Sequence, residues 1–184
     1  MRLILLGMAA LLLTGCAGAM PGAGEQVFGP RAGDSLMTVG ASYSVVEVDD
    51  SRDTETVDAE VSLGASHFFA DAHEFGILAN LRRSEIEVGT VDLNSTIYSL
   101  TPFYNFNVLS GERTFFYVGP HAGIQLYDIE GDDHTSVSYG GHVGIRHFHS
   151  ARTALFIEPR YTRYDVSGDN VNDFSILMGL QFRF

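Results

Sequence analysis

The chain contains a single cysteine, Cys16, so no disulfide bond can form within it. Basic residues are also scarce: 11 stand against 23 acidic residues, and the formal net charge is −12. We therefore expect no nucleic-acid partner, because phosphate binding needs a basic surface. Beyond its N-terminus, the chain lacks any apolar run long enough to cross a membrane as a helix. The mature protein is thus either soluble after export or a β-barrel.

The N-terminus has the pattern of a secretory signal, because Arg2 precedes an apolar run that extends from Leu3 to Leu13. The LTGC sequence at 13–16 resembles the lipobox of bacterial lipoproteins, in which the cysteine is acylated. Cleavage after the small-x-small sequence AGA at 17–19 is the alternative, and both remain open. We therefore expect a signal peptide with lipobox at 1–15, a flexible periplasmic tether rich in Gly, Ala and Pro at 16–34, and a barrel domain at 35–184.

From residue 35 to the C-terminus, apolar residues alternate with small or polar ones, which is the period of a β-strand. About eight such stretches occur, an even number. The joins after the second, fourth and sixth are tight, whereas those after the first, third, fifth and seventh are longer and acidic. The pattern predicts an all-β fold, an eight-stranded antiparallel up-and-down transmembrane β-barrel with both termini in the periplasm.

The chemistry of the two strand faces indicates which one meets lipid. One face is nearly all aliphatic or aromatic, and the other combines Gly, Ser, Asn and Thr with charged residues. Soluble barrels such as lipocalins place apolar residues inside, whereas membrane barrels reverse this. Aromatic residues near the strand ends fit the girdles of a membrane barrel. We therefore expect Val39, Val61 and Ile124 to face outward, and Glu60 and Arg160 to face a narrow lumen.

Three segments carry a resemblance to a known family: YVGPHAG at 117–123, EPRY at 158–161 and the terminal QFRF at 181–184. Residues 35 to 184 resemble the OmpA/OmpX-type small outer-membrane β-barrel domain family, although a lipobox departs from its pattern. The terminal aromatics Phe182 and Phe184 resemble the signal that the barrel-assembly machinery recognises, so the resemblance implies this machinery as a partner. It also implies a location in the bacterial outer membrane.

A polar cluster is expected inside the lumen, formed by Glu60, Arg82, His121, His142, Arg146, Glu158 and Arg160. Counting from the tight turn near residue 71 places Glu60 opposite Arg82, and counting from residue 131 places His121 opposite His142. Glu158 falls near Gly144, with Arg146 and Arg160 one inward step away. Buried charges require partners, so a static polar core is the main interpretation and a gate or proton-linked switch the alternative. An open pore is not expected at this strand count.

Other candidate sites lie at the two ends of the barrel. An acidic outer rim that includes Asp49, Asp50, Asp132, Asp133, Asp169 and Asp173 could collect divalent cations or bridge to lipopolysaccharide, or it is only a solvated surface. At the periplasmic end, His67, His73, His147 and His149 lack an assured third ligand, so we predict no metal site. His149, Ser150 and Glu158 come nearest to a hydrolase set, but in an arrangement that is wrong for catalysis.

These expectations lead to a non-enzymatic outer-membrane barrel without a cofactor, which supports envelope integrity or presents acidic loops for surface interaction. Its expected partners are outer-membrane lipids, lipopolysaccharide and the assembly machinery, and a barrel of this size needs no second copy to close. The alternatives are a lipid A-modifying outer-membrane enzyme and a periplasmic lipoprotein with a lipocalin-like cavity.

Overall fold

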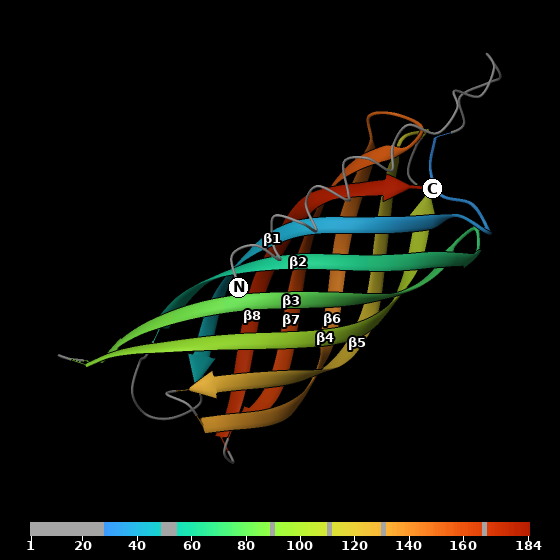
Figure 1. Ribbon diagram of the computed structural model, residues 1–184. Coiled ribbons are helices and arrows are strands. Elements are labelled where there is room, and N and C mark those ends of the chain that lie inside the picture. The colour runs from blue at the N-terminus through green and yellow to red at the C-terminus, as the bar shows by residue number, and fades with distance from the viewer. Residues whose placement is uncertain (1–27, 49–54, 89–90, 110–111, 130–131, 167–168) are drawn as a thin grey trace.

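The computed structural model describes residues 28–48, 55–88, 91–109, 112–129, 132–166 and 169–184. None of these residues belongs to a helix that could cross a membrane. They form eight strands: β1 (Ser35–Val48), β2 (Glu55–Ala70), β3 (His73–Val88), β4 (Val91–Leu109), β5 (Thr114–Ile129), β6 (Asp132–Phe148), β7 (Thr153–Val166) and β8 (Asp169–Arg183). Each strand pairs antiparallel with the next, and β1 pairs with β8 to close the barrel (Figure 1). The predicted fold class is confirmed.

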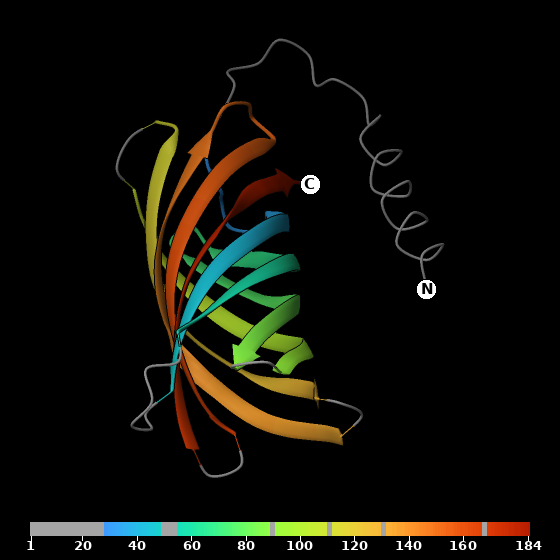
Figure 2. The ribbon, with the colours of Figure 1, turned by 90° about the vertical axis from the view of Figure 1, so that its left-hand side faces the viewer.

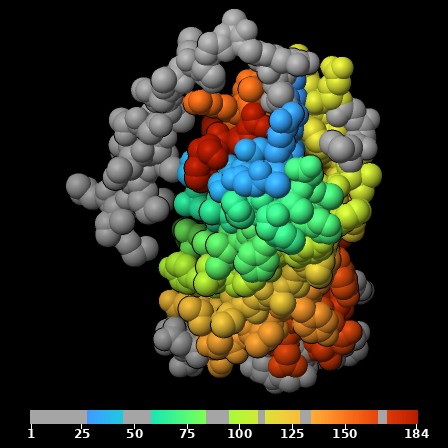
Figure 3. Space-filling model, turned by 90° about the vertical axis from the view of Figure 1, so that its right-hand side faces the viewer, coloured from blue at the N-terminus to red at the C-terminus, as the bar shows by residue number. Residues whose placement is uncertain are grey.

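Side chains alternate between the outer surface and the lumen along every strand. Val61 and Ile124 expose 58% and 52% of their surface, whereas Arg160 exposes 8%. The strands run obliquely around the barrel in Figure 2, and their outer surfaces follow one another as consecutive coloured bands in Figure 3. Apolar residues thus cover the outside and the charged residue Arg160 lies inside, as predicted, so the lipocalin-like arrangement is wrong.

The two ends of the barrel differ in their connections. We call the turn end the one that carries the β2–β3 turn, the C-terminus and the start of β1; Ser35 and Phe184 pair there through their backbones. The other end is the loop end. Three connections there hold only two residues each, 89–90, 130–131 and 167–168, and each pair includes a glycine.

The longer acidic loops predicted after the third, fifth and seventh strands are therefore wrong. Most of their residues extend the strands instead, because valine and isoleucine in these segments favour strand pairing and a glycine permits a two-residue hairpin. Asp132, Asp133 and Asp169 thus lie in β6 and β8 rather than in loops.

A short segment before β1, residues 28–34, lies across the turn end of the lumen. Phe28 packs against the buried cluster that contains Phe115 and Phe148. Arg183 Nη1 donates a hydrogen bond to the Gly29 carbonyl oxygen at 2.5 Å. Gly29 has φ +87°, and a Cβ there would lie 1.9 Å from a ring atom of Phe115, so only glycine fits. These residues end the segment that we expected to be a flexible tether, and they are packed against the barrel.

Candidate functional site in the barrel lumen

The lumen is filled by alternating apolar and ionic layers. At the turn end, Phe115 and Phe148 pack edge to face, with ring centroids 5.7 Å apart, and Ala154 completes their cluster. Leu36 and Phe68, both fully buried, also point inward near this end. The sequence prediction placed only small and polar residues in the lumen, so these large apolar side chains are a correction to it.

The first ionic layer is a pair between Glu74 on β3 and Arg146 on β6, and neither side chain is accessible to solvent. Arg146 Nη2 lies 3.0 Å from Glu74 Oε2, and its guanidinium carbon lies 5.0 Å from the centre of the Tyr117 ring. Glu74 also accepts hydrogen bonds from Ser66 Oγ at 2.5 Å and from Asn105 Nδ2 at 3.0 Å. A buried guanidinium is tolerated here because it has a carboxylate and an aromatic face as partners.

A second apolar cluster occupies the middle of the barrel and consists of Leu78, Phe103, Phe156 and Leu177. Close to the first ionic layer, the ring of Tyr117 lies over Gly144. A Cβ at Gly144 would lie 2.2 Å from Tyr117 Cζ, so the tyrosine fits only because this position has no side chain. Glycine therefore makes room for large lumen side chains in a barrel of this small diameter.

The two lumen histidines are in contact. His121 Nδ1 and His142 Nδ1 are 3.2 Å apart, and the rings stack at 25°. Their strands pair differently from the prediction, with His121 opposite Gly140 and His142 opposite Gly119. The β5–β6 connection is centred between residues 130 and 131, whereas a pairing of His121 with His142 requires a centre between residues 131 and 132, so the register moves by two residues. The long side chains still meet on the diagonal.

Hydrogen bonds connect the histidines to the Glu74 layer. Asn105 donates from Nδ2 to Glu74, so its Oδ1 faces His142 Nε2 at 2.5 Å and must accept from it. In the neutral pair, His142 Nδ1 then accepts from His121, and the Thr162 hydroxyl donates to His121 Nε2 at 3.0 Å. In this series of hydrogen bonds from Thr162 to Glu74, each donating group has an acceptor. This arrangement favours a static polar core.

Arg160 and Glu158 form an ion pair on the inner face of β7 and are both buried. Residue pairs on either side, Ile145 with Ile157 and His142 with Arg160, place Glu158 beside Gly144 as predicted. Glu158 nevertheless pairs with Arg160 on its own strand.

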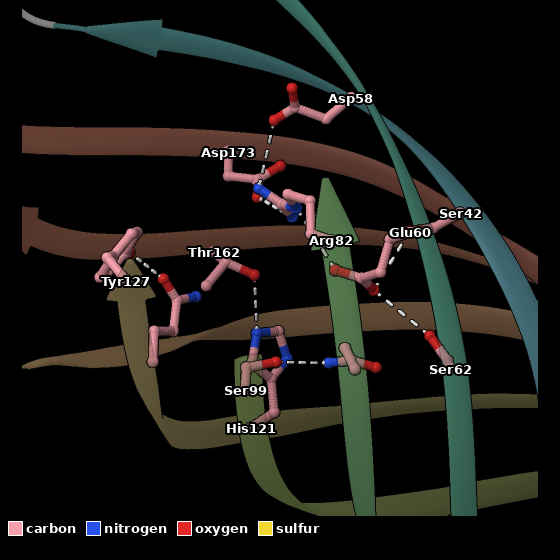
Figure 4. A network of polar contacts seen from close by, with 12 residues as sticks. Ser42, Asp58, Glu60, Ser62, Arg82, Ser99, His121, Tyr127, Thr162 and Asp173 are labelled. Atoms are coloured by element: carbon pink, nitrogen blue, oxygen red, sulfur yellow. Dashed lines mark hydrogen bonds and ion pairs between the residues drawn. The ribbon is translucent and has the colours of Figure 1, made fainter. Parts of the chain in front are cut away.

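The largest ionic layer surrounds Arg82 towards the loop end (Figure 4). Glu60 lies directly opposite Arg82 on the neighbouring strand, as predicted, and its Oε2 is 3.4 Å from Arg82 Nε. Asp173 on β8 pairs with Arg82 Nη2, and Asp58 Oδ2 lies 3.8 Å from Nη1. Asp173 exposes only 1% of its surface, so its predicted place on the outer rim is wrong. A third apolar cluster lies next to this layer on the side of the loop end and consists of Ile97, Tyr127, Tyr164 and Val171.

The described residues leave a small cavity in the lumen. A cavity of about 30 Å³ lies between Arg82, Arg160 and His121 and is lined by their polar neighbours. This volume holds about one water molecule. In the described part of the lumen, three arginines (Arg82, Arg146 and Arg160) face five carboxylates (Asp58, Glu60, Glu74, Glu158 and Asp173).

The predicted polar cluster left out Asp58, Glu74 and Asp173, which are all buried in the lumen. The alternation itself contained the signal for Glu74, because Glu74 shares the inward face of β3 with Leu78 and Arg82. Its partner could not be found by counting along neighbouring strands, because β3 and β6 are not adjacent in the barrel.

The other predicted sites lie at the ends of the barrel or outside the described residues. Phe184 exposes 78% of its surface beside β1, and Phe182 pairs with Met37. Cys16, Asp49 and Asp50 lie outside the described residues, as do the side chains of Asp132, Asp133 and Asp169. Within the part of the chain that the structure describes, no three His, Cys, Asp or Glu residues are arranged to hold a metal ion.

A family model for the outer membrane protein beta-barrel domain matches residues 9–184. The crystal structure of neisserial surface protein A is similar with a TM-score of 0.68 and 14% identity, over 83% of this chain and 99% of that one. For the crystal structure of OprG from Pseudomonas aeruginosa, the TM-score is 0.58 and the identity 14%, over 85% of this chain and 98% of that one. For Ail of Yersinia pestis in complex with the heparin analogue sucrose octasulfate, the TM-score is 0.50 and the identity 17%, over 83% of this chain and 99% of that one. No curated protein matches the chain in sequence.

Proposed function

Because the chain belongs to the outer membrane protein β-barrel domain family, we propose that it is a closed, non-enzymatic barrel of the bacterial outer membrane. In this role it reinforces the envelope and presents its acidic loop end at the cell surface. The filling of the lumen by the described side chains is the observation that carries this proposal. Three apolar clusters alternate with ionic layers along the barrel, and the described cavity between Arg82 and Arg160 has room for about one water molecule.

The acidic loop end supports a role at the cell surface. The start of β1 and the C-terminus lie at the turn end, and we place that end in the periplasm because the N-terminal sequence has the pattern of an export signal. The opposite end then faces outward with its acidic hairpins, including Asp132, Asp133 and Asp169. Divalent cations held by these carboxylates would bridge to lipopolysaccharide phosphates. A polyanion such as the sulfated sugar bound by Ail would be repelled.

The arrangement of Ser150, His149 and Glu158, the side chains that come nearest to the catalytic residues of a hydrolase, supports the absence of catalysis. Ser150 Oγ accepts hydrogen bonds from the backbone amides of Arg152 and Thr153, so it stabilises a turn. Glu158 lies inside the lumen and pairs with Arg160, whereas His149 is exposed at the turn end. A nucleophile needs a base within hydrogen-bond reach and a third group that orients the base. We therefore expect lipid A from cells with and without the protein to have identical mass spectra.

Conductance tests the sealed lumen directly. The purified protein, folded in planar bilayers, should show no steady channel, and vesicles that contain it should exclude small sugars. A strain that lacks the protein should become more sensitive to detergents. The triple variant D132N/D133N/D169N then separates the two roles, because it should restore the barrel but not the cation-dependent part of the resistance. A steady conductance in wild-type protein, or a change in the lipid A spectrum, would show that the proposed function is wrong.

A further inference from the structure

A group of basic residues lies on one side of the turn end, where β5, β6 and β7 meet. We call Arg113, His147, His149 and Arg152 the basic arc. Its members are neighbours in the fold, because the Phe148 amide donates to the Arg113 carbonyl at 2.8 Å and Thr114 lies opposite His147. Among the described residues of the two connections there, 112–113 and 149–152, Glu112 is the only carboxylate.

Local contacts orient the side chains and backbone of the basic arc. Thr114 Oγ1 lies 2.9 Å from His147 Nδ1, which leaves Nε2 to face the surroundings. The guanidinium carbon of Arg113 stacks 4.0 Å from the centre of the Phe28 ring, so its in-plane N–H groups remain free to donate. Ser150 Oγ accepts from the Arg152 amide at 3.2 Å and fixes the β6–β7 turn. All four members of the arc are exposed.

An apolar band begins one outward-facing step along the same strands. Phe116, Ile145 and Leu155 expose 44%, 39% and 54% of their surface. They lie two residues from Thr114, His147 and Thr153 on β5, β6 and β7, a distance of about 7 Å along a strand. A lipid whose tails cover this band would therefore have its phosphate at the height of the basic arc.

We infer that the basic arc is a binding surface for the headgroups of anionic phospholipids. Guanidinium groups donate two parallel hydrogen bonds to phosphate oxygens, and imidazole N–H groups add further donors. The opposite side of the turn end differs, because its basic residues lie beside carboxylates: Arg183 pairs with Asp34, and Arg31, His67 and His73 lie near Asp34 and Asp71. The inference requires membrane insertion but not the proposed orientation or function.

The complete lack of tryptophan in the chain permits a local test. L155W places a single tryptophan beside the basic arc, and F75W places one on the opposite side; Phe75 exposes 56% of its surface. Each variant is folded in vesicles of phosphatidylglycerol and phosphatidylcholine, in which one lipid carries brominated tails that quench tryptophan fluorescence. Gel mobility with and without heating verifies that each variant is folded. Both leaflets have the same composition, so orientation does not affect the measurement.

We expect the L155W reporter to show a preference for phosphatidylglycerol that F75W lacks. An arginine near an anionic surface contributes about fivefold in affinity. R113Q/R152Q in the L155W background should therefore lower the preference by at least about fivefold. R163Q changes an outward arginine near the loop end and should leave the preference unchanged. Equal preferences at L155W and F75W, or a preference that survives R113Q/R152Q, would overturn the inference.

Discussion

Replacing Glu74 with glutamine tests how strongly the barrel depends on its buried ion pairs. Glu74 and Arg146 are both inaccessible to solvent, and their closest atoms lie 3.0 Å apart. Glutamine keeps the size of the side chain but removes its charge, and a guanidinium cannot lose its proton to compensate. In E74Q, Arg146 would face a neutral amide and the rings of Phe68 and Tyr117.

The structure predicts an asymmetry between the two single variants. Breaking a buried ion pair by removing one partner costs about 3–5 kcal/mol, and we expect E74Q in this range. R146M leaves Glu74 with hydrogen bonds from Ser66, Asn105 and Asn107. Its cost should therefore be smaller, about 1–3 kcal/mol. E74Q/R146M should regain at least about 2 kcal/mol relative to E74Q, because no unpaired charge remains.

The assay is urea unfolding of the protein in lipid vesicles, followed by far-UV circular dichroism and by the gel mobility of unheated samples. E112Q is the matched control, because Glu112 is exposed at the turn end and its change should stay within about 0.5 kcal/mol. The reasoning is refuted if E74Q stays within about 1 kcal/mol of wild type. It is also refuted if R146M lowers the free energy of unfolding by more than E74Q does.

Three further predictions concern backbone positions and the C-terminus. In urea unfolding, G144A should lose about 1–3 kcal/mol because its Cβ would clash with a lumen tyrosine, whereas G141A, with its nearest atom at 3.6 Å, should change little. G29A should release the segment before β1 and speed hydrogen exchange at the β2 amide that bonds to this segment. G33A shares the strain of a positive φ but its Cβ would meet no atom within 4 Å, so it should do so less. F184A should slow membrane insertion in cells while leaving refolding into lipid vesicles unchanged, since the assembly machinery acts only in cells; equal slowing in both would contradict that role.

The barrel architecture could be predicted from the sequence because strand alternation is a local property. The pairing of Glu60 with Arg82 could be predicted for the same reason, since the β2–β3 turn fixes the register at Ala70 and His73. For His121 and His142, an error of one residue in the turn centre moved the register by two residues. Counting from a turn therefore succeeds only where the turn residues themselves can be located.

Contacts across the lumen could not be predicted in this way. Arg82 pairs with Asp173, 91 residues away, and Arg146 with Glu74, 72 residues away, and neither pair lies on adjacent strands. Asp173 looked like a surface residue because its neighbours in the sequence are acidic and polar. Its burial results from barrel closure, which brings β8 beside β1 and directs residue 173 inward.

The ion pair between Glu74 and Arg146 has a consequence for how the barrel is assembled. Glu74 belongs to β3 and Arg146 to β6, so the carboxylate gains its arginine only when the sixth strand is in place. A charged side chain without its partner in hydrocarbon costs about 3 kcal/mol. A sheet that inserted into the bilayer one strand at a time would carry this cost from its third strand to its sixth. Insertion after most of the strands have paired avoids it, so the position of these two residues in the sequence favours late insertion.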